Sequence, residues 1–132
     1  MPIARAWDFS KYHAVVDLGG GGGGLIAAIL KCFPSVMGML VDRQEAIDAA
    51  APRFEREGLD DRCKLQAADL RNEVPAGADV YMLKHVLHGY EDGAAIEILS
   101  QCLSVLPEEG RLLVIEFVLP DVVMRIRSWN TG

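Results

Sequence analysis

Short apolar runs alternate along the chain with segments in which apolar residues recur at helical spacing. Four of the five runs are nearly uniformly apolar, as expected for strands that helices cover on both faces. The remaining run, 62–67, is mixed in character. Together the runs predict strands at 14–18, 36–41, 62–67, 79–83 and 111–119.

Helices are predicted in three of the intervening segments. Residues 25–33 form the first, which Pro34 stops, and residues 43–57 form the second, with Pro52 restarting or kinking it. The third covers 92–106, where apolar side chains repeat every three or four residues. Strands that alternate with helices predict an α/β fold with a doubly wound, mostly parallel sheet. The length of 132 residues allows one domain.

Composition and charge narrow the functional classes. The chain has a formal net charge of −6 and a pI near 5.0, which argues against nucleic acid or an anionic membrane as a partner. No apolar run approaches the roughly 20 residues that span a bilayer, and the start lacks the apolar core of a signal peptide. The three cysteines are widely spaced and odd in number, as in proteins of a reducing compartment. We therefore expect a cytoplasmic protein.

Six consecutive glycines, Gly19–Gly24, join the first predicted strand directly to the first predicted helix. A flexible linker would carry polar spacers between independent segments, which this run lacks. A glycine-rich turn at the carboxyl end of a strand is instead where open α/β sheets bind ligands, because backbone N–H groups at the following helix N-terminus face the ligand. The run therefore predicts a binding loop.

Two kinds of ligand fit such a loop. Gly19, Gly21 and Gly24 satisfy the G-x-G-x-x-G pattern of dinucleotide-binding loops, and Asp42 follows at about the right distance for a ribose hydroxyl. Six glycines satisfy almost any glycine pattern, so this match alone is weak. Asp17 discriminates between the two, because a carboxylate repels a pyrophosphate and attracts a cationic ammonium group. The loop therefore favours a ligand that is positively charged at this point.

The stretch VVDLGGGGGG resembles the D-x-G-x-G-x-G motif of class I S-adenosylmethionine-dependent methyltransferases. The longer series VMGMLVD, GLDDRCKLQAADL, DVYMLKHVLHGYED and PEEGRLLVIEFVLP is similar, in order and spacing, to the small-molecule O-methyltransferases of the plant caffeate and flavonoid type and their bacterial relatives. The likeness runs from about Ile3 to Asp121. It implies a Rossmann-like, truncated class I methyltransferase core over residues 1–120, followed by a tail at 121–132 that does not resemble the family.

The resemblance implies S-adenosylmethionine as cofactor and S-adenosylhomocysteine as product, and it gives roles to individual residues. Asp17 and alternate glycines would surround the methionine part, whereas the remaining glycines would be dispensable; a charge favoured by the helix N-terminus is the alternative for Asp17. Asp42 would accept both ribose hydroxyls, and a role as N-cap of the next helix is compatible with this one. Asp69 would accept from the adenine amine and Leu70 would pack on the ring, with an ordinary turn aspartate as alternative. The implied cofactor-binding residues are Asp17, Gly19, Gly21, Gly23, Asp42, Asp69, Leu70 and Lys84.

His88, in LKHVLHGY, matches the catalytic base of the family, and Glu116 matches the acid that orients this histidine. The reaction needs a group that takes a hydroxyl proton near neutral pH while the oxygen attacks the sulfonium methyl group, which suits imidazole. Without the family, a partly buried structural histidine would be preferred. A metal site built from His85, His88 and Glu91 is disfavoured, because Gly89 makes a shared helix doubtful and no H-E-x-x-H or C-x-x-C pattern occurs.

The sequence departs from the family in two ways. Gly89 and Tyr90 stand where members carry Asp and Trp, which removes an acid beside His88. The resemblance also does not include the N-terminal helical domain of the family or its residues after the fifth strand. We therefore expect a cofactor-binding half without most of the acceptor site. The expected function is methyl transfer from S-adenosylmethionine to a hydroxyl of a small, aromatic molecule. A cofactor-binding fragment without activity is the alternative, and an NAD-dependent oxidoreductase is a third hypothesis that Asp17 disfavours.

The fifth predicted strand, 111–119, would be a long apolar edge of the sheet, and an open edge pairs readily with another chain. The following stretch VMRIRSW alternates between apolar and polar residues and is suited to pair with this edge. We therefore expect either a homo-oligomer or a chain that covers the edge with its own tail.

Overall fold

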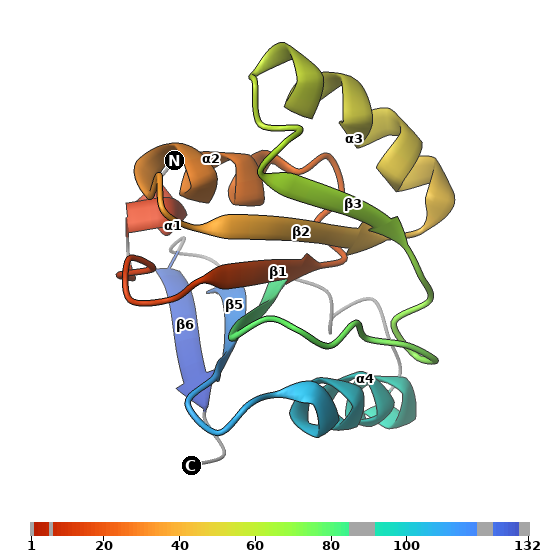
Figure 1. Cartoon of the computed structure of the whole chain (residues 1–132). Helices are drawn as coiled ribbons and strands as arrows, with labels where there is room; N and C mark the ends of the chain where they lie inside the picture. Colours follow the sequence, from red (N-terminus) through yellow and green to blue (C-terminus); the bar gives the residue numbers. More distant parts are fainter. Residues whose placement is uncertain (1, 6, 85–91, 119–122, 130–132) are drawn as a thin grey trace.

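The structure is a computed structural model that describes residues 2–5, 7–84, 92–118 and 123–129. Six strands in these residues form one sheet in the order β3-β2-β1-β4-β5-β6 (Figure 1). The strands are β1 (Ala14–Leu18), β2 (Met37–Asp42), β3 (Cys63–Ala67), β4 (Val80–Lys84), β5 (Arg111–Val118) and β6 (Val123–Trp129). The helices are α1 (Pro2–Arg5), α2 (Gly24–Cys32), α3 (Gln44–Arg56) and α4 (Asp92–Val105).

The sheet is parallel except at one edge, where β6 runs antiparallel to β5. α2 and α3 lie on one face of the sheet and α4 lies on the other (Figure 1). Buried side chains form one cluster on each face, and neighbouring residues of β1 divide between them: Val15 joins the cluster that includes α2 and α3, and Val16 joins the cluster that includes α4. This alternation explains why the central strands are apolar throughout. The predicted doubly wound, mostly parallel α/β fold is confirmed.

The element boundaries agree with the prediction to within one residue, but two details differ. Pro52 does not restart α3, which is continuous from Gln44 to Arg56. Pro52 and Asp48, whose carbonyl loses its N–H partner, are both exposed, so water can hydrogen-bond that carbonyl. The sequence also did not indicate α1, a single turn that packs against α2 and buries Ala4. No helix within the described ranges is long and apolar enough to cross a membrane.

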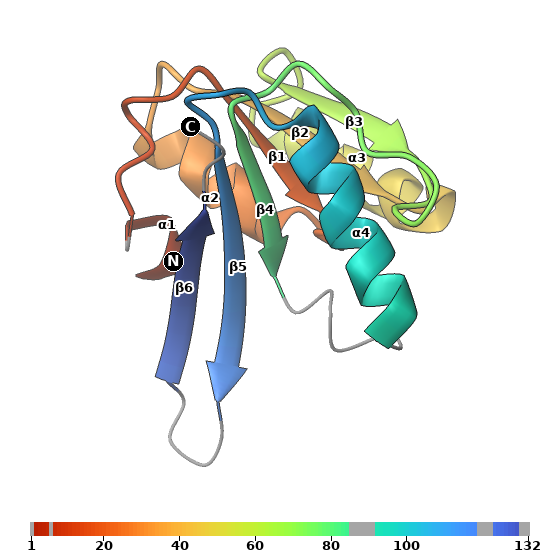
Figure 2. The same ribbon diagram turned by 90° about the horizontal axis from the view of Figure 1, so that it is seen from below.

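The apolar edge of β5 is covered by β6. The two strands pair in register from Leu112 opposite Trp129 to Val118 opposite Val123, and Figure 2 shows them side by side. Of the two arrangements expected from the sequence, the structure therefore contains the one in which the tail covers the edge. Because β6 is the outer strand, the edge of β5 is not open and does not support a homo-oligomer. The homo-oligomer stays a prediction.

Candidate functional site

The carboxyl ends of β1, β2, β3 and β4 meet at one edge of the sheet, because these strands are parallel and adjacent. In register, Leu18 lies between Val41 and Leu83. Asp42 lies beside Ala67. The glycine loop, the end of β2 and the turn after β3 therefore gather at the edge where open α/β sheets bind ligands. The structure thus brings together the segments that the sequence predicts for the methionine, ribose and adenine parts of a cofactor.

The glycine loop connects β1 to α2 with alternating left-handed residues. Gly19, Gly21 and Gly23 have φ angles of 70°, 62° and 82°, a region that a side chain disfavours. The amide of Gly19 donates to the carbonyl of Val41 at 2.7 Å, which ties the start of the loop to β2. Gly23 is the N-cap of α2, and its carbonyl accepts from the amide of Ala27 at 3.0 Å. The three glycines that the sequence singles out are thus the three loop residues whose backbone conformation favours glycine.

Two glycines of the loop are also required for space. A Cβ atom at Gly20 would overlap the Asp17 carboxylate and lie 2.6 Å from Cδ1 of Leu40. A Cβ atom at Gly23 would lie 2.5 Å from Cε2 of Phe54. The prediction that the unassigned glycines are dispensable is therefore wrong for Gly20. Leu40 and Phe54 form the floor of the loop. The sequence did not indicate this role, because an apolar residue in a strand or helix is also expected in any hydrophobic core.

Asp17 lies beneath the loop, against Gly20, and its side chain is only 1% exposed. Side chains of a strand alternate between faces, so Asp17 shares the face of Val15, toward α2 and α3. In this arrangement of the loop, the carboxylate has no surface for a ligand to touch, and its role toward a cofactor stays a prediction. Burial, and to a smaller extent the charge of Asp17, raises the pKa of the Cys63 thiol to about 12.

Asp42 ends β2 and is half-buried. Its Oδ2 atom accepts from the amide of Gly21 at 2.9 Å, and its Oδ1 atom accepts from the amide of Arg43 at 2.7 Å. The backbone carbonyl of Asp42 accepts from the amide of Ala68 at 2.9 Å. The further role as a helix N-cap is wrong, because Arg43 occupies the N-cap position of α3. A carboxylate has about four acceptor positions, so each oxygen keeps capacity for one hydroxyl donor.

Asp69 and Leu70 follow β3 and take different environments. The Asp69 carboxylate is exposed and accepts from the amide of Arg71 at 3.0 Å and from Nδ2 of Asn72 at 3.2 Å. These bonds make it a turn aspartate, the alternative that the sequence left open. Leu70 is 4% exposed and packs in the cluster on the α4 face of the sheet. Contacts of this pair with an adenine ring stay a prediction.

The predicted catalytic residues lie partly within the described structure. Lys84 ends β4 and pairs with Ile115, so Glu116 follows one residue further along β5, at the same edge. Glu116 stands opposite Arg125 of β6 in register. His88 lies in the segment 85–91, outside the described residues, as do the other members of the disfavoured metal set. Within the described ranges, no group of three or more His, Cys, Asp or Glu side chains is placed to hold a metal ion.

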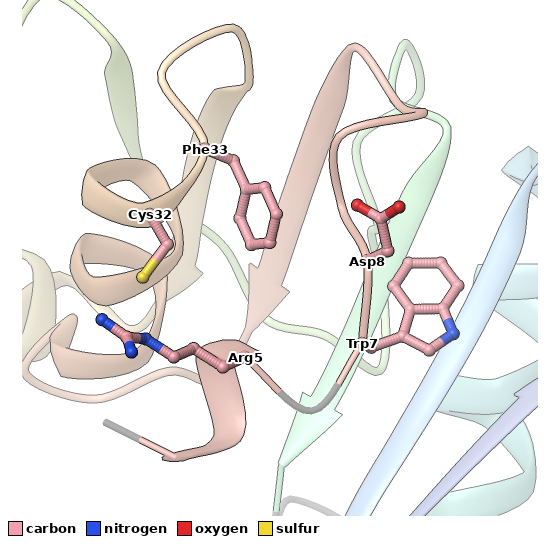
Figure 3. A pocket seen from close by; sticks show the side chains of 5 residues that line it. All are labelled: Arg5, Trp7, Asp8, Cys32 and Phe33. Atoms are coloured by element: carbon pink, nitrogen blue, oxygen red, sulfur yellow. The ribbon is translucent and has the colours of Figure 1, made fainter.

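A separate cavity of about 440 Å³ lies near the residues that precede β1 and β2. Its lining residues are Arg5, Trp7, Asp8, Cys32 and Phe33 (Figure 3). α2 begins at the glycine loop and ends at Cys32, so the length of the helix separates this cavity from the loop. None of the predicted site residues lines the cavity, and the sequence did not indicate it.

The chain belongs to the O-methyltransferase domain family, whose sequence profile matches residues 2–127. Among its relatives, the phenazine O-methyltransferase PhzM of Lysobacter antibioticus is 41% identical over 119 residues. Aclacinomycin 10-hydroxylase RdmB of Streptomyces purpurascens is 39% identical over 113 residues. Among solved structures, the O-methyltransferase NcsB1 from neocarzinostatin biosynthesis, in complex with S-adenosylmethionine and 2-hydroxy-5-methyl naphthoic acid, matches with a TM-score of 0.84 at 38% identity.

These matches cover most of this chain but only part of each relative. They include 90% of this chain and 35% of PhzM, 86% of this chain and 30% of RdmB, and 88% of this chain and 36% of the NcsB1 chain. The chain therefore spans about a third of the length of these proteins. Family and fold follow from the matches, whereas the activity of a whole protein does not.

Proposed function

We propose that the chain binds S-adenosylmethionine, and its product S-adenosylhomocysteine, at the carboxyl edge of β1, β2 and β3. The observation that carries the proposal is the junction of the glycine loop with Asp42, where both carboxylate oxygens accept backbone amides and keep one acceptor position each. A vicinal diol, such as that of a ribose, offers two hydroxyl donors to this group. The complex of the related NcsB1 with S-adenosylmethionine supports the same choice.

A negative charge beneath the loop would favour S-adenosylmethionine over a dinucleotide as the ligand. The buried Asp17 carboxylate lies directly against Gly20, so a pyrophosphate over the loop would meet a negative charge at short range. S-adenosylmethionine carries an ammonium and a sulfonium group, which the same charge attracts. The NAD hypothesis therefore has the weaker physical support, although the G-x-G-x-x-G spacing allows it.

The proposed reaction is methyl transfer to a hydroxyl group of a small aromatic molecule. S-adenosylmethionine supplies an electrophilic methyl group on a cationic sulfur, which leaves as a neutral thioether. In this proposal His88 takes the hydroxyl proton as the oxygen forms its bond to the methyl carbon, and Glu116 orients the imidazole. Alignment of oxygen, carbon and sulfur supplies much of the rate. The hydroxynaphthoic acid bound by NcsB1 indicates the class of acceptor.

Binding is tested by isothermal titration calorimetry with S-adenosylhomocysteine. Asp42→Ala removes both ribose acceptors and is expected to weaken binding by about tenfold or more, because hydrogen bonds to a charged group are lost. Asp48→Ala, which removes an exposed carboxylate from α3, is the matched control and should leave the affinity unchanged. No binding of S-adenosylhomocysteine by the unmodified chain, or tighter binding of NAD, would contradict the proposed cofactor.

Transfer is tested with S-adenosylmethionine and a panel of phenols and hydroxynaphthoic acids, with products identified by mass spectrometry. His88→Ala is expected to lower kcat by about 100-fold or more while leaving the affinity for S-adenosylhomocysteine unchanged, because a general base contributes to chemistry and not to cofactor binding. Equal activity in the variant would exclude His88 as the base. Cofactor binding without any methylated product would favour the alternative function, a binding fragment.

We further propose a cytoplasmic homo-oligomer that has neither nucleic acid nor membrane as a partner. The net charge of −6 supports the exclusion of polyanions. The position of β6 at the end of the sheet, among the strands that the structure describes, supports self-association, because an edge strand is a template for a second copy. Light scattering that gives the mass of a single chain across the micromolar range would rule out the oligomer.

A further inference from the structure

The glycine loop and the end of β2 hold one carboxylate between two backbone amides. The amide of Gly21 lies 2.9 Å from Oδ2 of Asp42, and the amide of Arg43 lies 2.7 Å from Oδ1. The two donors belong to different segments: one lies in the loop after β1, and the other is the N-cap residue immediately before α3. Each oxygen is thus engaged by one donor, so rotation of the carboxylate breaks both bonds together.

We propose that the amides of Gly21 and Arg43 are positioning groups that fix the Asp42 carboxylate, before any ligand arrives, in the orientation that receives the ribose hydroxyls. This inference rests on the proposed cofactor. An aspartate side chain at a strand end otherwise populates more than one staggered rotamer about χ1 and rotates broadly about its terminal torsion. Binding to a side chain that is already ordered avoids the entropy cost of ordering it, which raises affinity by roughly three- to tenfold per side chain.

The arrangement gives the left-handed conformation of Gly21 a function apart from close approach of a ligand. Its φ of 62° accompanies the bond from its amide to Asp42, although a Cβ atom at this position would have nothing within 4 Å. The glycine is therefore favoured there by backbone direction and not by space. The side chain of Arg43 is exposed, so the contribution of this residue comes from its backbone N–H.

Arg43 also offers a substitution that removes one donor and suits the local backbone conformation. Its φ of −67° and ψ of 158° are values that proline adopts, and the preceding residue ends a strand, as proline prefers. The carbonyl of Arg43, which accepts from the amide of Ile47 at 3.1 Å, is kept in the variant, so the first turn of α3 remains closed. Arg43→Pro deletes the N–H, whereas Arg43→Ala deletes the side chain and keeps the N–H.

The experiment measures affinity for S-adenosylhomocysteine in the whole chain and in these two variants. Arg43→Pro is expected to bind about tenfold more weakly, and Arg43→Ala within about twofold of the unmodified chain. In an Asp42→Ala background, Arg43→Pro should cause no additional loss, because the amide acts only through that carboxylate. The 2′-deoxy analogue of the ligand should lose less affinity on Arg43→Pro than the parent ligand does.

A second readout needs no ligand. Three-bond NMR couplings to the Asp42 carboxylate carbon should report one rotamer in the unmodified chain and in Arg43→Ala, and an average of rotamers in Arg43→Pro. A single unchanged rotamer in Arg43→Pro, or an equal loss of affinity with and without Asp42, would overturn the inference. If the unmodified chain does not bind S-adenosylhomocysteine, the proposed cofactor is wrong, and the couplings still decide whether the two amides hold the carboxylate.

Discussion

Replacing Gly23 with alanine is expected to lower the free energy of unfolding by about 3 kcal/mol. The φ of 82° at this residue costs a non-glycine residue about 1–2 kcal/mol. The new methyl group would also lie 2.5 Å from Cε2 of Phe54, and overpacking of this kind costs about 1–3 kcal/mol. The loop and the aromatic ring under it cannot both keep their places. Denaturation in urea, monitored by circular dichroism, measures the change.

The control is Gly22, the neighbour in the same run. It lacks a positive φ, and a Cβ atom there would meet nothing within 4 Å, so Gly22→Ala should change the unfolding free energy by less than about 1 kcal/mol. Phe54→Leu removes the ring that the new methyl group would strike. In that background, Gly23→Ala should retain only the backbone part of its effect, about 1–2 kcal/mol. Equal losses of unfolding free energy in Gly22→Ala and Gly23→Ala would contradict the different structural roles of the two glycines.

Much of the fold is predictable from the sequence because its strands and helices have distinct apolar patterns. Uniformly apolar strands are expected only where both faces are covered, and the two clusters on opposite faces of the sheet explain that pattern. The pairing of β6 was only one of two expected arrangements. An alternating sequence such as VMRIRSW indicates a strand, but it does not determine whether the partner belongs to the same chain.

The sequence predicts where the glycine loop lies, between β1 and α2, but not how deeply Asp17 is buried beneath it. Spacing placed Asp17 next to the glycines, and this suggested contact with a ligand. In the structure the alternation of β1 turns the carboxylate inward, beneath Gly20. The floor residues Leu40 and Phe54 lie in a different strand and helix, and no local pattern relates them to the loop. The burial of Asp17 and the side chains that support the loop depend on tertiary packing, which the spacing of residues in the sequence does not specify.

Arg62→Ala is expected to destabilise the chain by about 3 kcal/mol, because one side chain joins three backbone carbonyls near the end of α2. Nη1 of Arg62 donates to Leu30 at 2.9 Å, and Nη2 donates to Phe33 at 3.0 Å and Val36 at 2.7 Å. Leu30 belongs to the last turn of α2, whose carbonyls have no partner within the helix, and Leu30, Phe33 and Val36 are all half-buried or buried. Loss of a charged donor that serves such carbonyls costs about 1.5–3 kcal/mol per hydrogen bond, and the three losses overlap.

The matched substitutions separate hydrogen bonding from packing and charge. Arg62→Met keeps most of the apolar stem and should lose nearly as much stability as Arg62→Ala, whereas Arg62→Lys should recover only part of the loss, because an ammonium group lacks the planar fork that reaches three acceptors. Arg56→Ala, which removes an exposed arginine from α3, should change the unfolding free energy by less than about 0.5 kcal/mol. Full stability in Arg62→Met would mean that the apolar stem, and not the three hydrogen bonds, supports the segment between α2 and β2.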